Sequence, residues 1–83
     1  MTVQEIEDKA WSLDGIRIVI RDKQNAKVSS YSHQYAVQAN WTVSKYIASR
    51  IEPLIGDREV IVVNGEGVKV NGNTLVSSVR NSY

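Results

Sequence analysis

Cysteine and phenylalanine are absent from the 83 residues, and proline and histidine each occur only once. Without cysteine, neither disulfides nor thiolate metal sites can support the core, and a cysteine nucleophile is excluded. A serine triad would need His33 as its base, yet no nucleophile elbow or suitably spaced acid accompanies it. The scattered carboxylates form no metal-binding motif with it. We therefore expect no catalytic residues, no metal and no cofactor, and hence a protein that is not an enzyme.

The chain also has no large excess of positive or negative charge, because ten basic and nine acidic residues leave a formal net charge of +1. That balance is too even to predict a polyanionic partner from charge alone. It also argues against an acidic protein that imitates DNA. A chain of this length has room for a single domain, which we expect to span residues 1–83.

Long apolar runs are missing as well, since the longest stretches, such as Val60–Val63, are four residues. Such runs are too short to span a bilayer. The N-terminal segment carries Glu5, Glu7 and Asp8 instead of a basic segment followed by an apolar one, so no secretory signal is expected. These features favour a cytoplasmic protein without a membrane partner.

What the chain does have is two Asn-Gly pairs, Asn64-Gly65 and Asn71-Gly72, in its last third. Both residue types tolerate positive φ, which two-residue hairpin turns require. The pairs separate β-branched runs at Glu59–Val63, Val68–Val70 and Thr74–Val79. The pattern predicts an antiparallel meander of three strands, with the residues from Asn81 onward fraying.

Near the N-terminus, Thr2 and Glu5 have the spacing of a capping box, and Asp14-Gly15 provides a helix stop. Apolar residues recur between them at helical spacing: Val3, Ile6, Ala10 and Leu13. We therefore predict a helix near residues 3–13, with Trp11 beside its apolar face. Ile16–Arg21 then alternates as a strand with one buried face.

The segment from Ala26 to Ala39 changes the phase of its alternation near residues 29–32, which predicts a bulge or two strands. A second helix is predicted over Val43–Leu54, capped by Asn40 or Thr42. Pro53 is expected to end or tighten that helix before Gly56. The order α-β-β(β)-α-β-β-β predicts an α+β fold, a single small domain in which two helices pack on one face of a twisted antiparallel sheet.

A basic patch surrounds the first predicted hairpin, where Arg17, Arg21, Lys23 and Lys27 occur close together. With tyrosines further along the chain, it has the ingredients of a platform for single-stranded nucleic acid. Acidic neighbours would neutralise part of it, so an ordinary solvated sheet face is the competing explanation.

An aromatic and polar patch follows, in which Tyr31, His33 and Tyr35 occur at alternate positions and Trp41 lies a short way beyond. Tyrosine and tryptophan combine a large contact area with a polar group, and they concentrate in protein interfaces. We expect Tyr35 and Trp41 to fill the core and the exposed remainder to contact a partner. An edge strand here could also pair with a partner strand or with a second copy of the chain.

The predicted architecture resembles the small phage-borne anti-CRISPR inhibitors, through the Ile16–Arg21 strand, the Val43–Leu54 helix and the Val60–Val79 meander. The resemblance implies a protein partner, a CRISPR effector, whose binding to target DNA or whose nuclease recruitment is blocked in the host cytoplasm. The sequence therefore predicts a protein-binding inhibitor, acting as a monomer or homodimer. Its predicted partner-binding residues are Arg17, Arg21, Tyr31, His33 and Tyr35. A nucleic-acid-binding accessory domain and a homodimeric structural module are the alternatives.

Overall fold

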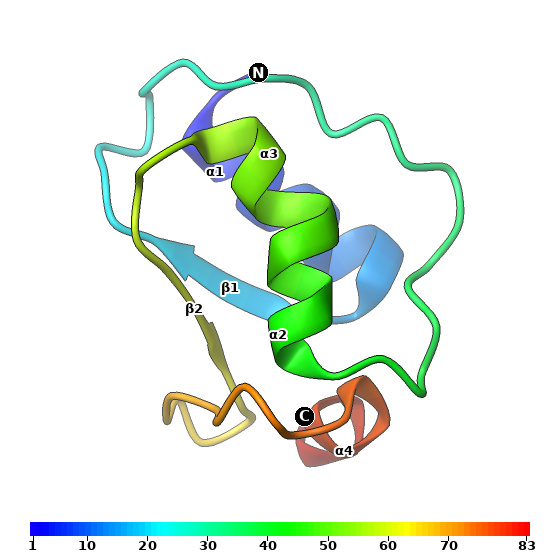
Figure 1. Cartoon of the computed structure of the whole chain (residues 1–83). Helices are drawn as coiled ribbons and strands as arrows, with labels where there is room; N and C mark the ends of the chain where they lie inside the picture. Colours follow the sequence, from blue (N-terminus) through cyan, green and yellow to red (C-terminus); the bar gives the residue numbers. More distant parts are fainter.

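Helices and a small sheet combine in an α+β arrangement, as the sequence predicts, and the computed structural model describes residues 1–83. In Figure 1 the strands lie to one side of a central helix, and a long irregular connection runs round the other side. The elements are α1 (Val3–Lys9), η1 (Ala10–Asp14), β1 (Arg17–Ile20), α2 (Val43–Tyr46), η2 (Ile47–Ile51), α3 (Glu52–Ile55), β2 (Val60–Val63) and α4 (Val76–Ser82). Of these, η1 and η2 are single π-helical turns.

The sheet consists of β1 and β2 alone, paired antiparallel with Arg17 opposite Val63 and Ile20 opposite Val60. Alternation along β1 buries Ile18 and Ile20 and leaves Arg17 and Val19 exposed. The sheet therefore has one face in the core and one face directed outward.

The first helix agrees with the prediction, because α1 and η1 together cover residues 3–14. Thr2 and Glu5 form the complete capping box, in which the Thr2 side chain accepts the Glu5 N–H. Gly15 ends the helix with φ of 68°, a left-handed conformation that a side chain would disfavour.

The second helix is also confirmed, and it runs without interruption from Val43 to Ile55 through α2, η2 and α3. Thr42 caps it by accepting the Lys45 N–H at 3.2 Å. Pro53 does not end the helix: it directly follows the π-helical turn η2 and Glu52, and α3 continues to Ile55. Gly56 follows the last helical residue.

Three of the predicted strand segments are not strands: residues 26–39, Val68–Val70 and Thr74–Val79. The segment from Ala26 to Ala39 has no regular structure, and its one strand-like contact is a bridge between Thr2 and Lys27. The last predicted strand is instead the helix α4, in which Val76 and Val79 are buried three residues apart. Of the meander, β2 and a single bridge from Val63 to Lys69 are present.

The Asn-Gly pairs do make turns, although by a different mechanism from the predicted one. Among the non-glycine residues none has positive φ, and neither Gly65 nor Gly72 has it. In the first turn the Asn64 side chain accepts the N–H groups of Glu66 and Val68. Position 65 has room only for a glycine, because a Cβ there would collide with the Ser82 carbonyl of α4.

One cluster of 15 buried residues forms the hydrophobic core between the helices and the inner face of the sheet. In Figure 1 the helix from α2 to α3 passes in front of the start of β1. None of the helices has both the length and the apolar character that crossing a bilayer requires. The largest fully buried side chains include Tyr46, Ile6, Ile16, Ile51 and Ile55.

Candidate functional site

The predicted partner-binding residues do not form one surface. Arg17 and Arg21 are exposed on or beside β1, whereas His33 and Tyr35 are exposed in the connection between β1 and α2. Figure 1 shows this connection and the strands on different sides of the central helix. The basic and aromatic parts of the prediction therefore belong to different faces.

Tyr31 is not a surface residue, because only 4% of it is exposed and its hydroxyl donates to the Asp14 carboxylate. The prediction that it contacts a partner is therefore wrong. The opposite error applies to Tyr35, which was expected in the core and is 81% exposed. Trp41 packs against the core while remaining half-buried, as expected in part.

Asp14 is the one charged residue buried in the core, with 1% of it exposed. One carboxylate oxygen accepts the Val37 N–H at 2.9 Å and an Arg50 N–H at 2.8 Å. The other accepts the hydroxyls of Tyr31 and Tyr46, the latter at 2.9 Å. A buried carboxylate needs this many donors, because water is excluded and its charge is otherwise uncompensated.

Side chains from three elements hold the long connection in place: Asp14 of η1, Arg50 of η2 and Arg80 of α4. Arg50 also donates to the Tyr35 carbonyl at 2.9 Å, and Arg80 of α4 donates to the carbonyls of Asp14 and Val37 at 2.8 and 2.7 Å. No buried side-chain nitrogen or oxygen is left without a partner. We call Asp14, Tyr31, Tyr46, Arg50 and Arg80 the Asp14 network.

The tyrosines of the Asp14 network stay protonated over the ordinary pH range. Burial, reinforced by the Asp14 carboxylate, raises the pKa of Tyr31 to about 12. The pKa of Tyr46 is raised further by the same causes. Both hydroxyls can therefore act as donors to Asp14, which fits a structural anchor because every group in the cluster is already engaged. Nowhere do three histidine, aspartate or glutamate side chains gather closely enough to share a metal ion.

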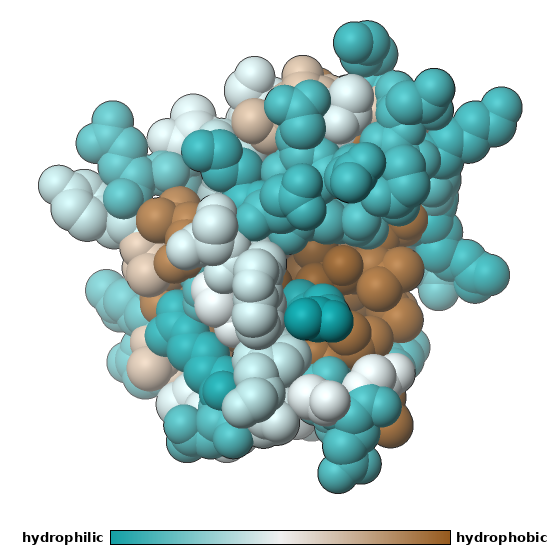
Figure 2. All heavy atoms as spheres, turned by 180° about the vertical axis from the view of Figure 1, so that it is seen from behind, coloured by the Kyte–Doolittle hydropathy of each residue, from teal (hydrophilic) through white to brown (hydrophobic).

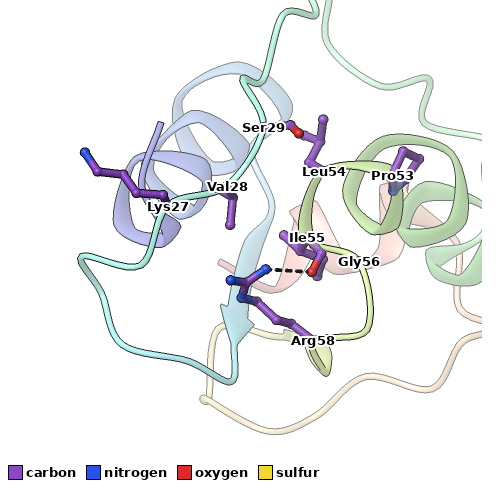
Figure 3. A pocket seen from close by; sticks show the side chains of 8 residues that line it. All are labelled: Lys27, Val28, Ser29, Pro53, Leu54, Ile55, Gly56 and Arg58. Carbon is purple, nitrogen blue, oxygen red and sulfur yellow. Dashed lines mark hydrogen bonds between the residues drawn. The ribbon is translucent and has the colours of Figure 1, made fainter.

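A groove of about 500 Å³ lies between residues 27–29 and the end of α3. Figure 3 shows that its cations do not converge, because the Lys27 side chain extends away from Arg58. Arg58 is occupied by a salt bridge to Asp22 at 2.5 Å and by the Ile55 carbonyl at 2.9 Å. The hydrogen bond from Arg58 lowers the pKa of Asp22. The groove thus offers no free cationic centre for an anion.

The outer face of the sheet has a different character. Val19 is 42% exposed in the middle of β1, and its register partner Ile61 on β2 is half-buried beside it. Figure 2 shows an apolar area over the part of the molecule where the two strands lie. Arg21 and Glu59 flank this area and form an exposed ion pair at 3.8 Å.

An aromatic cluster adjoins this face at the start of β1. The Arg17 guanidinium lies over the Trp11 ring at 4.9 Å, and Trp11 meets Tyr83 edge-on with ring centroids 5.0 Å apart. The Tyr83 hydroxyl accepts the Arg17 N–H at 2.8 Å and donates to the Val63 carbonyl at 2.6 Å. Burial raises the pKa of Tyr83, which keeps that hydroxyl available as a donor.

Trp11, Val19 and Tyr83 are absent from the predicted set of binding residues, although Arg17 is in it. Trp11 could have been found from the helical periodicity, because it falls beside the apolar face of the first helix. Tyr83 could not, because the chain end was expected to fray and its contacts are with residues 17 and 63.

Comparisons with protein-family models, with curated proteins and with solved structures found no match to this chain. The chemistry of the exposed side chains is then the guide to what they bind. Tryptophan, tyrosine and arginine are the residue types that carry most of the binding free energy in protein interfaces. Here all three lie together beside an apolar strip of the outer sheet face, in which Val19 is exposed and Ile61 is half-buried.

Proposed function

We propose that this protein is a non-enzymatic protein-binding module that uses the outer face of its sheet. The observation that carries this proposal is the shared exposure of Trp11 (44%), Val19 (42%) and Tyr83 (38%) around Arg17. We call these four residues, together with Ile61, the sheet surface. The rings are already fixed against one another, so little side-chain freedom remains to be lost on binding.

The composition of the sheet surface also indicates the chemistry of its partner. The apolar strip is best matched by an apolar strip on the partner. Around it lie two arginines, Arg17 and Arg21, and one glutamate, Glu59. A partner with an apolar centre and a mainly acidic rim would therefore complement it. The resemblance to anti-CRISPR inhibitors adds a particular candidate, a CRISPR effector protein whose DNA-binding or nuclease-recruiting surface would be covered.

The test compares two variants on different sides of the molecule, Val19→Glu on the sheet surface and Tyr35→Ala on the long connection. Proteins captured from a lysate by the tagged wild-type chain are identified, purified and titrated against each variant. We expect Val19→Glu to weaken binding about tenfold or more, because a charge would be buried against an apolar strip. Tyr35→Ala should leave the affinity unchanged. Circular dichroism of both variants confirms that they are folded.

The reverse result, with binding lost in Tyr35→Ala and kept in Val19→Glu, would move the interface to the connection and contradict the proposal. Two further measurements separate the alternatives. Oligonucleotide binding that falls steeply with salt would indicate a nucleic-acid-binding domain. Sedimentation that shows a dimer abolished by Val19→Glu would indicate that the sheet surface binds a second copy.

A further inference from the structure

Arg17 differs from the other four arginines of the chain. Arg21, Arg50 and Arg58 form ion pairs, and Arg80 donates two hydrogen bonds to backbone carbonyls. The Arg17 guanidinium makes no ion pair and no hydrogen bond, and its only specific contact is with the Trp11 ring. Its five N–H donors are therefore free to bind an acceptor from another molecule.

The position of this guanidinium is fixed by a chain of contacts. The guanidinium lies over the Trp11 ring, and the Trp11 ring contacts the Tyr83 ring edge-on at an interplanar angle of 86°. The Tyr83 hydroxyl in turn forms hydrogen bonds with the backbone of both strands. A guanidinium attracted to the face of an aromatic ring loses part of its freedom, while its N–H donors remain available to an acceptor. Arg17 is thus held in place before any ligand arrives.

A hollow of about 260 Å³ lies at this point, between the aromatic cluster and the turn after β2. No acidic side chain is among the residues that line it. The lining residues are Trp11, Arg17, Asn64, Gly65, Gly67 and Tyr83. The hollow is below the size of typical small-molecule pockets, roughly 300–1,000 Å³, and suits a single side chain.

The glycines of the turn do not make this hollow a phosphate site. The Gly65 N–H already donates to the Ser82 hydroxyl, and the Gly67 N–H donates to the Asn64 carbonyl, both at 3.0 Å. A phosphate loop depends on several free backbone N–H groups, which are lacking here. One guanidinium with free donors matches the charge and the planar geometry of one carboxylate.

We propose that the hollow at Arg17 is a carboxylate-binding subsite of the sheet surface. It takes the side chain of an aspartate or glutamate on the partner protein, while neighbouring apolar residues of the partner pack on Val19 and Ile61. This inference rests on the proposed protein-binding function and specifies the partner: an extended segment in which an acidic residue stands next to apolar ones. The carboxylate accepts two parallel N–H bonds from Arg17, above the Trp11 ring.

The test uses two capped tripeptides, acetyl-Val-Glu-Val-amide and its glutamine counterpart, titrated into the isotope-labelled protein. Nuclear magnetic resonance signals of the Trp11 indole N–H and the Arg17 side-chain N–H report the binding. We expect a saturable shift with the glutamate peptide and an affinity about tenfold lower for the glutamine peptide, since a charge-assisted pair becomes neutral. Inorganic phosphate should bind more weakly than the glutamate peptide.

Three variants complete the experiment. Arg17→Gln should abolish the preference for glutamate, and Arg17→Lys should retain only part of it, because an ammonium is a point charge without the planar fork. Arg21→Gln is the matched control, since Arg21 is exposed near the same strand and is paired with Glu59. It should leave the preference unchanged.

The subsite is rejected if both peptides bind equally, if no saturable shift occurs, if phosphate binds more tightly, or if Arg21→Gln has the same effect as Arg17→Gln. The protein-binding function can survive that result. A captured partner that is lost with Val19→Glu but retained with Arg17→Gln would uphold the sheet surface and remove the carboxylate subsite from it.

Discussion

Asp14 ends the first helix, and in the sequence it has the properties of an ordinary helix-terminating residue beside a glycine. Its burial could not be predicted from that position, because its partners come from residues 31, 37, 46 and 50. The tyrosine at position 31 was equally misleading. It belongs to a polar stretch of the sequence, and only the folded chain brings it to a buried carboxylate.

Removing this carboxylate should be costly. We expect Asp14→Ala to lower the free energy of unfolding by about 3–5 kcal/mol, because Arg50 is left as a largely buried charge without its partner. Urea denaturation measures the change. Asp8→Ala is the control, since Asp8 is exposed on α1 and forms no ion pair. Equal losses in the two variants would contradict the importance given to the Asp14 network.

The Asp14 network also predicts alkaline instability. The pKa of Tyr31 is raised from 10.0 to about 12 on folding, so the folded chain holds this proton more tightly than the unfolded chain. The resulting stabilisation is complete below pH 10 and is lost as the pH rises through 12. Denaturation at a series of pH values should show this decline, and Tyr31→Phe should reduce its slope. Tyr35→Phe, at an exposed position, should not alter the slope.

At the scale of elements, the sequence predicts what depends on near neighbours. The first helix, the second helix and the strands at Arg17–Ile20 and Val60–Val63 all follow from local periodicity and caps. The last element does not, because Val76 and Val79 fit a helix as well as an extended run. The environment decides the outcome, since both valines are buried when the segment is helical.

The contact between the turn after β2 and the end of α4 is a second feature of this scale. We expect Gly65→Ala to lower the free energy of unfolding by roughly 1–3 kcal/mol, since the new Cβ would collide with the Ser82 carbonyl. Chemical denaturation gives the loss, and fluorescence of Trp11 reports whether Tyr83 has moved from it. Ser82→Ala, which removes only the hydroxyl, serves as the comparison. A fully neutral Gly65→Ala would show that α4 is free to shift.

At the scale of the whole molecule, residues 21–42 form a connection without regular structure that is much longer than most loops. Within this connection, buried residues that are hydrogen-bonded to Asp14 are separated by exposed residues. Tyr31 and Val37 are buried and bound to Asp14, and the five residues between them are exposed. Sequence patterns could not show this, because the connection is held by single residues and by no repeated element.

Limited proteolysis should reveal these anchors. Chymotrypsin is expected to cut the wild-type connection after Tyr35, which is exposed, and not after Tyr31, which is buried. In Asp14→Asn the anchor is weakened, so an early cut after Tyr31 should appear in the mass spectrum of the fragments. Asp8→Asn should give the wild-type pattern. A wild-type chain cut first at Tyr31 would show that the anchor does not hold in solution.

The long sequence separations within the Asp14 network bear on how quickly the chain can reach its native state. Its hydrogen bonds join residues that are 15 to 66 positions apart. Such distant pairings require large loops to close before any contact rewards them, and this slows folding. We therefore expect assembly of the Asp14 network to be a late step of folding. Until that step, a nascent or refolding chain carries an ionised, hydrated aspartate at the place where its interior must become dry.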